Sequence, residues 1–116
     1  MTEETTVKNQ YIGENFALYN VDNVEGIKSI PDNSIHYCIY SPPFISLFTY
    51  SNNERDIGNC TTDEEFYTHF GYLVKELFRV MMPGRDMSVH CMDLPTSKQR
   101  DGIIGLKDFR GILIKI

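Results

Sequence analysis

Hydrophobic residues recur at helical spacing between positions 62 and 81, and this is the clearest pattern in the chain. Five apolar side chains follow one another at intervals of three or four residues and would form one continuous helix face: Phe66, Phe70, Leu73, Leu77 and Met81. Thr62 and Glu65 precede this face in the arrangement of a capping box, and Pro83-Gly84 follows it as a stop signal. The pattern predicts a long amphipathic helix whose apolar face belongs to the core.

Three short apolar runs have the length and composition of strands. They span residues 16–20, 35–40 and 87–92. The middle run is almost wholly apolar, as is typical of a parallel strand that is buried on both faces.

A second, shorter helical pattern lies between the first two of these runs. Asp22 and Glu25 resemble a capping box, with aspartate in place of the usual serine or threonine, and Val24, Ile27 and Ile30 then form a short apolar stripe. Strands and helices therefore alternate along the chain. This order predicts an α/β fold with βαβ units and a parallel sheet flanked by helices.

The two ends of the chain are expected to differ in structure. Residues 1–12 are expected to be flexible. The apolar positions within 108–116 fit an amphipathic helix, although the β-branched residues there leave a strand possible. Because this apolar segment ends at Ile116, we expect the chain to be the N-terminal part of a longer domain.

Composition adds three constraints. The length of 116 residues fits a single domain with a core of its own, and no apolar run is long enough to form a transmembrane helix. The three cysteines favour free thiols in a reducing cytoplasm over a disulfide framework. The net charge of −5 counts against tight binding of DNA by this segment alone.

The segment Ser41-Pro42-Pro43-Phe44 follows directly after the run 35–40, and ligands of open α/β sheets bind at the carboxyl ends of strands. The two prolines make a stiff loop that lacks two amide donors, so its backbone carbonyls are free to face a ligand. Ser41 adds a hydroxyl and Phe44 adds a flat apolar face. Together these groups suit a planar ring with an amino group, such as a flipped cytosine or adenine.

Ser41-Pro42-Pro43-Phe44 resembles the (Ser/Asp/Asn)-Pro-Pro-(Tyr/Phe/Trp) motif of the DNA methyltransferases that modify exocyclic amino groups. The segments 19–22, 30–35 and 77–84 are similar to the family's sequence around this motif, so the resemblance covers roughly residues 16–94. It implies a partial Rossmann-like methyltransferase fold, with 1–116 as the N-terminal part of one catalytic domain.

The resemblance also implies a reaction, a cofactor and roles for individual residues. S-adenosylmethionine would donate a methyl group to the amino group of a flipped base in DNA, as in restriction-modification or phage DNA protection. Ser41 and the Pro42 carbonyl would hold that amino group, Pro43 would stiffen the loop and Phe44 would stack on the base. Asp22 and Ser41 would lie near the cofactor. Serine at the first motif position leans toward cytosine over adenine.

The chain departs from the family pattern in one respect and leaves several interpretations open. It has no Phe-x-Gly-x-Gly signature, which the family uses to cradle the methionine part of the cofactor; in one arrangement of the family this signature follows the Pro-Pro motif. A homo-oligomer or a missing C-terminal portion would then complete the site. The alternative is a shortened, inactive module that pairs with another chain. RNA or a protein glutamine is a further possible substrate.

Other polar groups suggest weaker hypotheses. The residues His69, His90, Cys60 and Cys91 match no common zinc spacing, so no metal site is expected. The polar stretch 50–60 is either a solvated loop or a cover for the base. Four cationic side chains near the C-terminus either contact phosphate or are simply solvated: Lys98, Arg100, Lys107 and Arg110.

Overall fold

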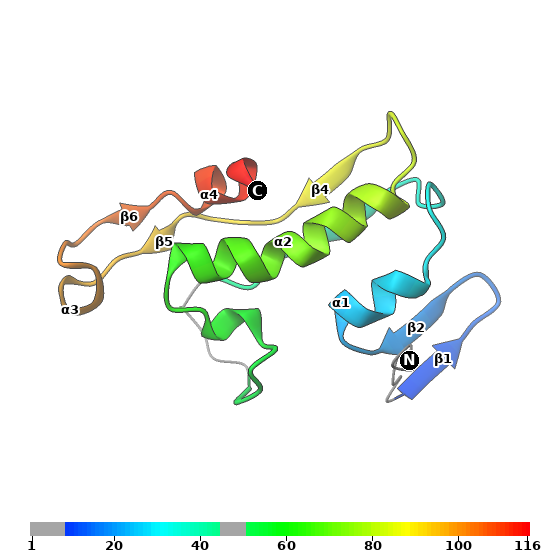
Figure 1. Ribbon diagram of the computed structural model, residues 1–116, viewed down its shortest axis with the longest axis horizontal. Helices are drawn as coiled ribbons and strands as arrows, with labels where there is room; N and C mark the ends of the chain where they lie inside the picture. The colour runs from blue at the N-terminus through cyan, green and yellow to red at the C-terminus, as the bar shows by residue number, and fades with distance from the viewer. Residues whose placement is uncertain (1–8, 45–50) are drawn as a thin grey trace.

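The structure of the chain is a computed structural model that describes residues 9–44 and 51–116. A long helix, α2, lies against small sheets in a mixed α/β arrangement (Figure 1). Along the chain the elements are β1 (Asn9–Ile12), β2 (Ala17–Asn20), α1 (Asn23–Gly26), η1 (Ile27–Ser29), β3 (Cys38–Tyr40), η2 (Ile57–Asn59), α2 (Asp63–Val80), β4 (Met87–Val89), β5 (Leu94–Pro95), α3 (Lys98–Asp101), β6 (Leu106–Lys107) and α4 (Phe109–Lys115). Among the described residues, β3–β4 is a parallel pair, whereas β1–β2 and β5–β6 are antiparallel. The expected α/β class is confirmed in this coarser form.

Helix α2 forms as the sequence pattern predicts. The Thr62 side chain accepts a hydrogen bond from the Glu65 amide at 3.2 Å, while the Glu65 carboxylate accepts from the Thr61 amide at 2.9 Å. The capping box therefore closes one residue earlier than the usual reciprocal pair. Phe66, Phe70 and other members of the predicted apolar face are buried or half-buried, and the helix ends at Val80 before the turn at Gly84, where φ is +75°.

The parallel pair β3–β4 lies beside α2. Cys38 pairs with Met87 and Tyr40 with Val89, and an isolated parallel bridge joins Ile35 to Met81. The strands are shorter than the predicted runs 35–40 and 87–92.

Burial of β3 on both faces was a wrong expectation. Ile39 is 69% exposed and Tyr37 is 55% exposed, whereas Cys38 and Tyr40 pack against the side of α2. The reason is that α2 covers one face of the two-stranded sheet, and no described residue buries the other. The apolar sequence was correct for a strand, but burial depends on which elements cover it.

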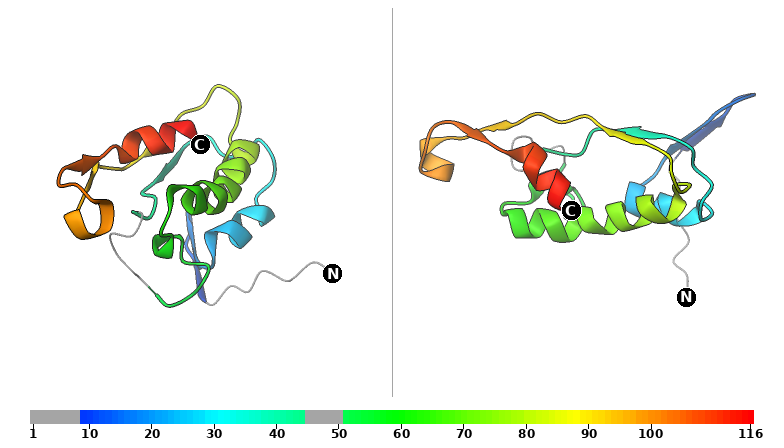
Figure 2. Two further views of the ribbon diagram at one scale, coloured as in Figure 1. Left: turned by 60° about the vertical axis from the view of Figure 1, so that its left-hand side comes forward. Right: turned by 90° about the horizontal axis from the view of Figure 1, so that it is seen from above.

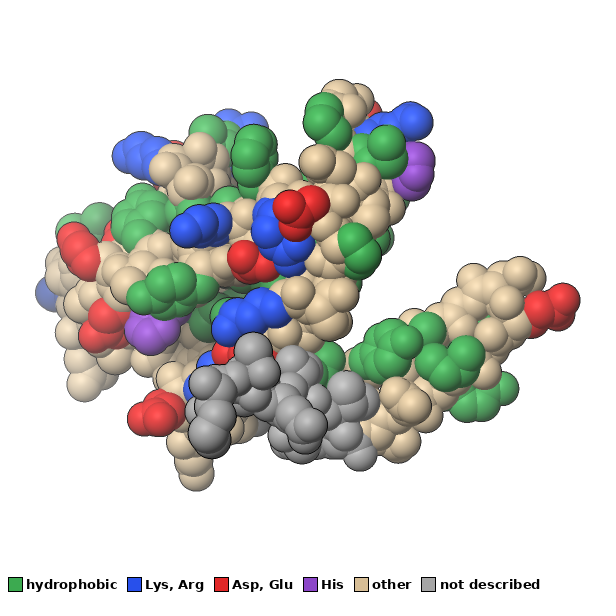
Figure 3. All heavy atoms as spheres, turned by 45° about the vertical axis from the view of Figure 1, so that its right-hand side comes forward, with side chains coloured by type: hydrophobic (Ala, Val, Ile, Leu, Met, Phe, Trp, Pro, Cys, Tyr) green, Lys and Arg blue, Asp and Glu red, His purple; other side chains and the backbone are tan. Residues whose placement is uncertain are grey.

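The run 16–20 also forms a strand, but in a different setting from the expected one. β2 pairs antiparallel with β1, so it belongs to a hairpin and not to the parallel sheet, and the first predicted βαβ unit is absent from the described residues. Gly13 allows the tight turn: its amide bonds to the Phe16 carbonyl at 2.8 Å, and a Cβ there would lie 2.4 Å from the Phe16 ring. The hairpin projects from the rest of the chain (Figures 2 and 3). Residues 1–8 of the segment expected to be flexible lie outside the described residues.

The segment 108–116 forms helix α4, which makes the strand interpretation wrong. The Asp108 side chain caps α4 by accepting from the Gly111 amide at 2.8 Å. Phe109 is fully buried, and its ring meets the ring of Phe66 edge-on with centroids 5.6 Å apart. The seven-residue helix therefore completes the cluster built on the first half of α2.

Candidate functional site

The proline motif lies at the carboxyl end of β3, as the sequence predicts for a ligand site. Directly after the strand, Ser41 is exposed and Pro42 is buried. A cavity of about 650 Å³, here called the motif pocket, is lined by Ser41, Pro42 and Pro43. Its volume lies within the range of about 300–1,000 Å³ that is usual for small-molecule sites.

The motif pocket has apolar walls with a few polar groups. Helix α2 contributes Phe70, Leu73 and Leu77, and the α1–η1 segment contributes Ile27 and Ile30. Tyr19 and Tyr40 add aromatic rings. Burial raises the pKa of the Tyr40 phenol above its ordinary value. Such a pocket suits a flat, weakly polar ring.

Ser41 has a partner that the sequence interpretation missed. Because Tyr40 pairs with Val89, the next residues on the two parallel strands, Ser41 and His90, come side by side. The His90 amide donates to the Tyr40 carbonyl at 2.9 Å, and the Ser41 hydroxyl donates to the His90 carbonyl at 3.2 Å. His90 Nδ1 also lies 3.4 Å from Ser41 Oγ. The signal in the sequence is that Ser41 directly follows one predicted strand and that His90 lies within the next predicted strand, 87–92.

Phe44 occupies a different place from the first three motif residues. Its ring meets the ring of Phe109 at 89° with centroids 5.6 Å apart, and it packs against the cluster that contains Phe66. It does not line the motif pocket. The structure thus brings Ser41, Pro42 and Pro43 together at one cavity and sets Phe44 against α4.

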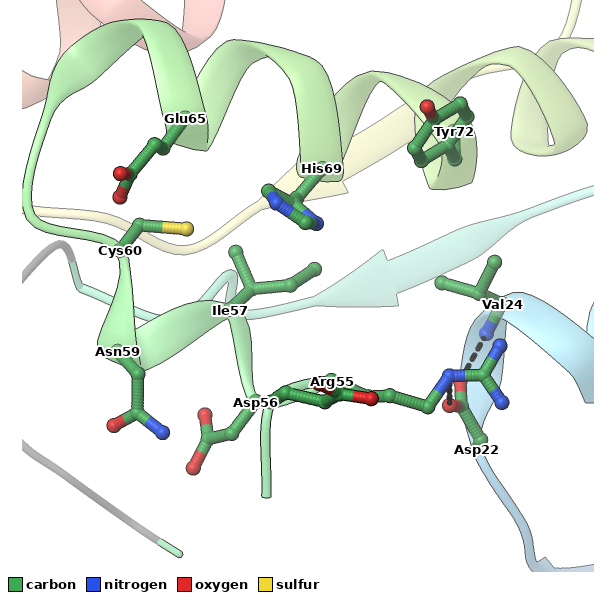
Figure 4. A pocket seen from close by; sticks show the side chains of 11 residues that line it. Asp22, Val24, Arg55, Asp56, Ile57, Asn59, Cys60, Glu65, His69 and Tyr72 are labelled. Atoms are coloured by element: carbon green, nitrogen blue, oxygen red, sulfur yellow. Dashed lines mark hydrogen bonds and ion pairs between the residues drawn. The ribbon is translucent and has the colours of Figure 1, made fainter. Parts of the chain in front are cut away.

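Asp22 caps α1, as the sequence predicts, and lines a second cavity. Its Oδ1 accepts from the Val24 amide at 2.9 Å, and its Oδ2 lies 3.3 Å from Arg55 Nε. The second cavity, of about 530 Å³, is here called the Arg55 pocket (Figure 4). The neighbours Val21 and Asn23 line the motif pocket instead. Asp22 and Ser41 therefore belong to adjacent cavities on the two sides of the α1 segment.

The described part of the loop 50–60 folds back onto α1, while Tyr50 lies outside the described residues. Arg55 Nη2 donates to Glu25 Oε1 at 2.7 Å, in addition to its contact with Asp22. Hydrogen bonds first from Lys28 and then from Arg55 hold the pKa of Glu25 below its ordinary value. The loop is further ordered by the Asp56 carboxylate, which accepts from the Ser51 and Gly58 amides at 2.9 Å. Arg55 thus fastens the loop after the motif to the helix before it.

Two of the four cationic side chains considered for phosphate contact, Arg100 and Lys107, pair with carboxylates. Lys107 forms an ion pair with Asp63, and Arg100 Nε lies 3.1 Å from Asp101 Oδ2.

Cys38, Cys60 and Cys91 carry free thiols, and burial raises the pKa of Cys38 and Cys60. In residues 9–44 and 51–116, no three His, Cys, Asp or Glu side chains form a group suited to a metal ion. Within the same residues, no helix combines the length and apolarity that a membrane span requires.

Comparison with known proteins finds one partial similarity. The type II methyltransferase M.SfiI of Streptomyces fimbriatus is 27% identical to this chain over 79 residues. These residues are 68% of this chain but 18% of the relative, so the chain matches less than a fifth of that protein's length. The similarity supports a relationship to a methyltransferase family. No protein-family model and no solved structure matches the chain.

Proposed function

We propose that this chain contributes the base-binding part of a DNA methyltransferase that modifies an exocyclic amino group, N-4 of cytosine or N-6 of adenine. The observation that carries the proposal is the position of Ser41, Pro42 and Pro43, which follow a parallel strand and line one cavity. The partial similarity to a type II methyltransferase supports the same class of reaction. As part of this proposal, the complete catalytic domain has the Rossmann-like fold of that class.

The chemistry assigned to each residue follows from its donors and acceptors. The Ser41 hydroxyl and the Pro42 carbonyl would accept hydrogen bonds from the amino group and fix its orientation. The aromatic rings of Tyr19 and Tyr40 provide apolar surface for the base within the motif pocket. Phe44 would stack on the base only after its ring leaves Phe109, where this structure places it.

S-adenosylmethionine is the methyl donor implied by this class, and when bound it supplies an electrophilic methyl group. The motif pocket does not fit its methionine part, because no charged side chain is among the residues that line this pocket. Both carboxylate oxygens of Asp22, the residue expected near the cofactor, already have partners in Val24 and Arg55. The donor set of the motif pocket fits a planar base better than it fits an ammonium and a carboxylate, and we assign the pocket to the base.

The test is methyl transfer from labelled S-adenosylmethionine to unmethylated duplex DNA, followed by digestion and chromatography of the nucleosides. We expect label in N4-methylcytosine or N6-methyladenine, and loss of at least about a hundredfold in rate for Ser41→Ala because a positioned polar contact is removed. Ser34→Ala is the matched control, since that exposed hydroxyl lies in the loop before β3 and donates to the Pro31 carbonyl at 2.7 Å.

The product decides between the proposals. Label at carbon 5 of cytosine, or full activity of Ser41→Ala, would contradict the assignment. Absence of transfer to any nucleic acid would favour the alternative, an inactive methyltransferase-like module that pairs with another chain. The exposed apolar side chains of the β1–β2 hairpin are the surface that such a module would offer (Figure 3).

A further inference from the structure

Positive charge in this chain is concentrated near its C-terminus. Residues 94–116 contain five Lys or Arg side chains and two Asp side chains, which gives this segment a net charge of +3. Because the whole chain carries −5, the residues before this segment carry −8. Such a division of charge within one chain is typical of proteins that bind a polyanion with one surface. The overall acidity of the chain therefore does not exclude an anionic partner for this segment.

Within this segment, residues 95–106, here called the arm, carry α3 and project from the rest of the molecule (Figures 1 and 2). Both ends of the arm are anchored. Leu94, directly before it, is 3% exposed and belongs to the core, and Lys107, directly after it, forms an ion pair with Asp63 at the start of α2. The arm therefore stands on a fixed base.

The arm is also ordered by its own hydrogen bonds. The Thr96 amide donates to the Gly105 carbonyl at 2.9 Å, and the Thr96 hydroxyl donates to the Ile103 carbonyl at 3.0 Å. Gly102 ends α3 with a φ of +79°, a conformation that favours glycine. The arm thus has a defined shape before any partner binds, so that it loses little conformational entropy on association.

Two neighbouring isoleucines of this ordered arm lie outside the core. Ile103 is 66% exposed and Ile104 is 83% exposed, and both follow the turn at Gly102. Lys98, which is also exposed, lies on α3 before the same turn. Proteins that enter the minor groove of DNA combine these two kinds of group: cations contact the phosphates, while apolar side chains such as isoleucine are inserted between base steps. The chemistry of the arm therefore fits duplex DNA.

The position of the arm relative to the motif pocket fits the same partner. β3 and β4 are parallel, so Ser41 after β3 and His90 after β4 lie at the same edge of the sheet, joined by a hydrogen bond of 3.2 Å. The chain then continues from His90 through β5 into the arm (Figure 1). The seven residues from His90 to Ser97 span at most about 23 Å, which is less than one helical turn of DNA, about 34 Å. A duplex that offers a base to Ser41 can therefore reach the arm within one turn.

We infer that the arm binds a groove of duplex DNA, with Lys98 on the phosphate backbone and Ile103 and Ile104 inserted between base steps. This inference rests on the proposed function for the identity of the partner as DNA. It adds a contact surface outside the motif pocket and gives that surface a task. Extruding a base requires the loss of its stacking, and side chains inserted between nearby steps weaken that stacking.

The experiment measures binding of the whole chain to a fluorescein-labelled duplex of about 20 base pairs, two helical turns, by fluorescence anisotropy over a series of salt concentrations. We expect Ile104→Ser to weaken binding about tenfold at every salt concentration, because one apolar side chain loses its burial. Lys98→Gln should reduce the slope of log Kd against log salt concentration by about one, because one phosphate contact is lost.

Matched controls lie outside the arm. Ile114 on α4 is 74% exposed and Lys75 on α2 is exposed, so Ile114→Ser and Lys75→Gln should keep the wild-type affinity and salt slope. A second measurement reports insertion directly. A duplex that contains 2-aminopurine becomes more fluorescent when this base loses its stacking, and we expect the wild type to cause this increase and Ile104→Ser to lose it.

Several results would overturn the inference. These are equal duplex affinities of the wild type and Ile104→Ser, binding of a single strand as tight as that of the duplex, or no binding of the duplex. Binding to phosphatidylglycerol vesicles without binding to the duplex would assign the arm to a membrane surface instead. A dimer in sedimentation that Ile104→Ser dissociates, with duplex affinity unchanged, would assign it to a second copy of the chain.

Methyl transfer separates this inference from the proposed function. Transfer to an amino group by a chain whose duplex affinity ignores the arm substitutions would overturn the inference and leave the proposed function standing. Duplex binding that depends on Lys98 and Ile104, without methyl transfer, would support the inference and contradict the proposed function.

Discussion

Arg55 and Asp22 form an ion pair, with Arg55 Nε 3.3 Å from Asp22 Oδ2, although they lie in separate segments of the sequence. The pair joins the loop that follows the proline motif to the cap of the helix that precedes it. Both residues line the Arg55 pocket, whereas Val21 and Asn23, on either side of Asp22, line the motif pocket.

Replacing Arg55 by glutamine should release this loop. The change removes the charge that faces Asp22 and Glu25, so amide exchange at Gly58 and Asn59 should become faster. High salt should produce the same change in the wild type, because ~1 M salt screens exposed charges beyond about 3 Å. Amide exchange followed by mass spectrometry measures both effects. Arg85→Gln, in the turn before β4, should leave the loop unchanged, and equal protection of the loop in Arg55→Gln would show that the ion pair does not hold it.

Glu25 gives the chain a pH dependence with a defined sign. Lys28 and Arg55 lower its folded-state pKa below the ordinary value of 4.5. A carboxyl with a lowered folded pKa stabilises the fold above its unfolded pKa, and this contribution is lost as the pH falls through the folded pKa. Urea unfolding between pH 6 and about pH 3 should therefore show a steeper loss of stability in the wild type than in Glu25→Gln. Glu14→Gln, in the β1–β2 turn, serves as the control, and parallel curves for wild type and Glu25→Gln would refute the assignment.

Arg79 supports one wall of the motif pocket from behind. Its Nη1 donates to the Ile30 carbonyl at 2.8 Å and its Nη2 to the Ile27 carbonyl at 3.0 Å, while both isoleucines line the pocket. A lysine has no planar fork to serve both carbonyls, so Arg79→Lys should lower Tm by on the order of 5 °C and weaken nucleoside binding. Calorimetry measures the first effect, and an NMR titration with deoxycytidine measures the second. Arg110→Lys is the control on α4; a wild-type Tm for Arg79→Lys would contradict this role.

The edge-to-face contact of Phe44 with Phe109 should appear as a coupling energy. In a double-mutant cycle with Phe44→Leu and Phe109→Leu, we expect a coupling of about 1 kcal/mol from chemical unfolding. Phe78 is 87% exposed, so Phe44→Leu and Phe78→Leu should be additive. A coupling near zero between Phe44 and Phe109 would mean that Phe44 is free to stack elsewhere in solution.

The features that the sequence predicts correctly are those encoded by close neighbours in the chain. Helix α2 follows from apolar spacing and the Thr62 cap, and the strand before Ser41 follows from an apolar run. Helix α4 is one of the two interpretations that the apolar spacing of 108–116 left open. Each depends on residues within about four positions of one another, where periodicity and capping act.

The features that could not be predicted from the sequence depend on contacts between segments that are distant in the chain. The hairpin pairing of β2 with β1, the exposure of Ile39 and the position of Phe44 beside Phe109 are all decided by tertiary neighbours. The pairing of Asp22 with Arg55 is a further case, because nothing in the local pattern around either residue selects the other. His90 is intermediate, since parallel pairing of two predicted strands places it beside Ser41 once their register is known.

Tyr40 and Leu73 pack against both hydrophobic clusters of the chain, and both also line the motif pocket. The two clusters therefore contact each other through Tyr40 and Leu73, which form part of the pocket wall. Neither cluster can loosen without disturbing that wall, so the chain should melt as one cooperative unit. By thermodynamic linkage, a ligand in the pocket would raise the stability of both halves at once, including the C-terminal helix that it does not touch.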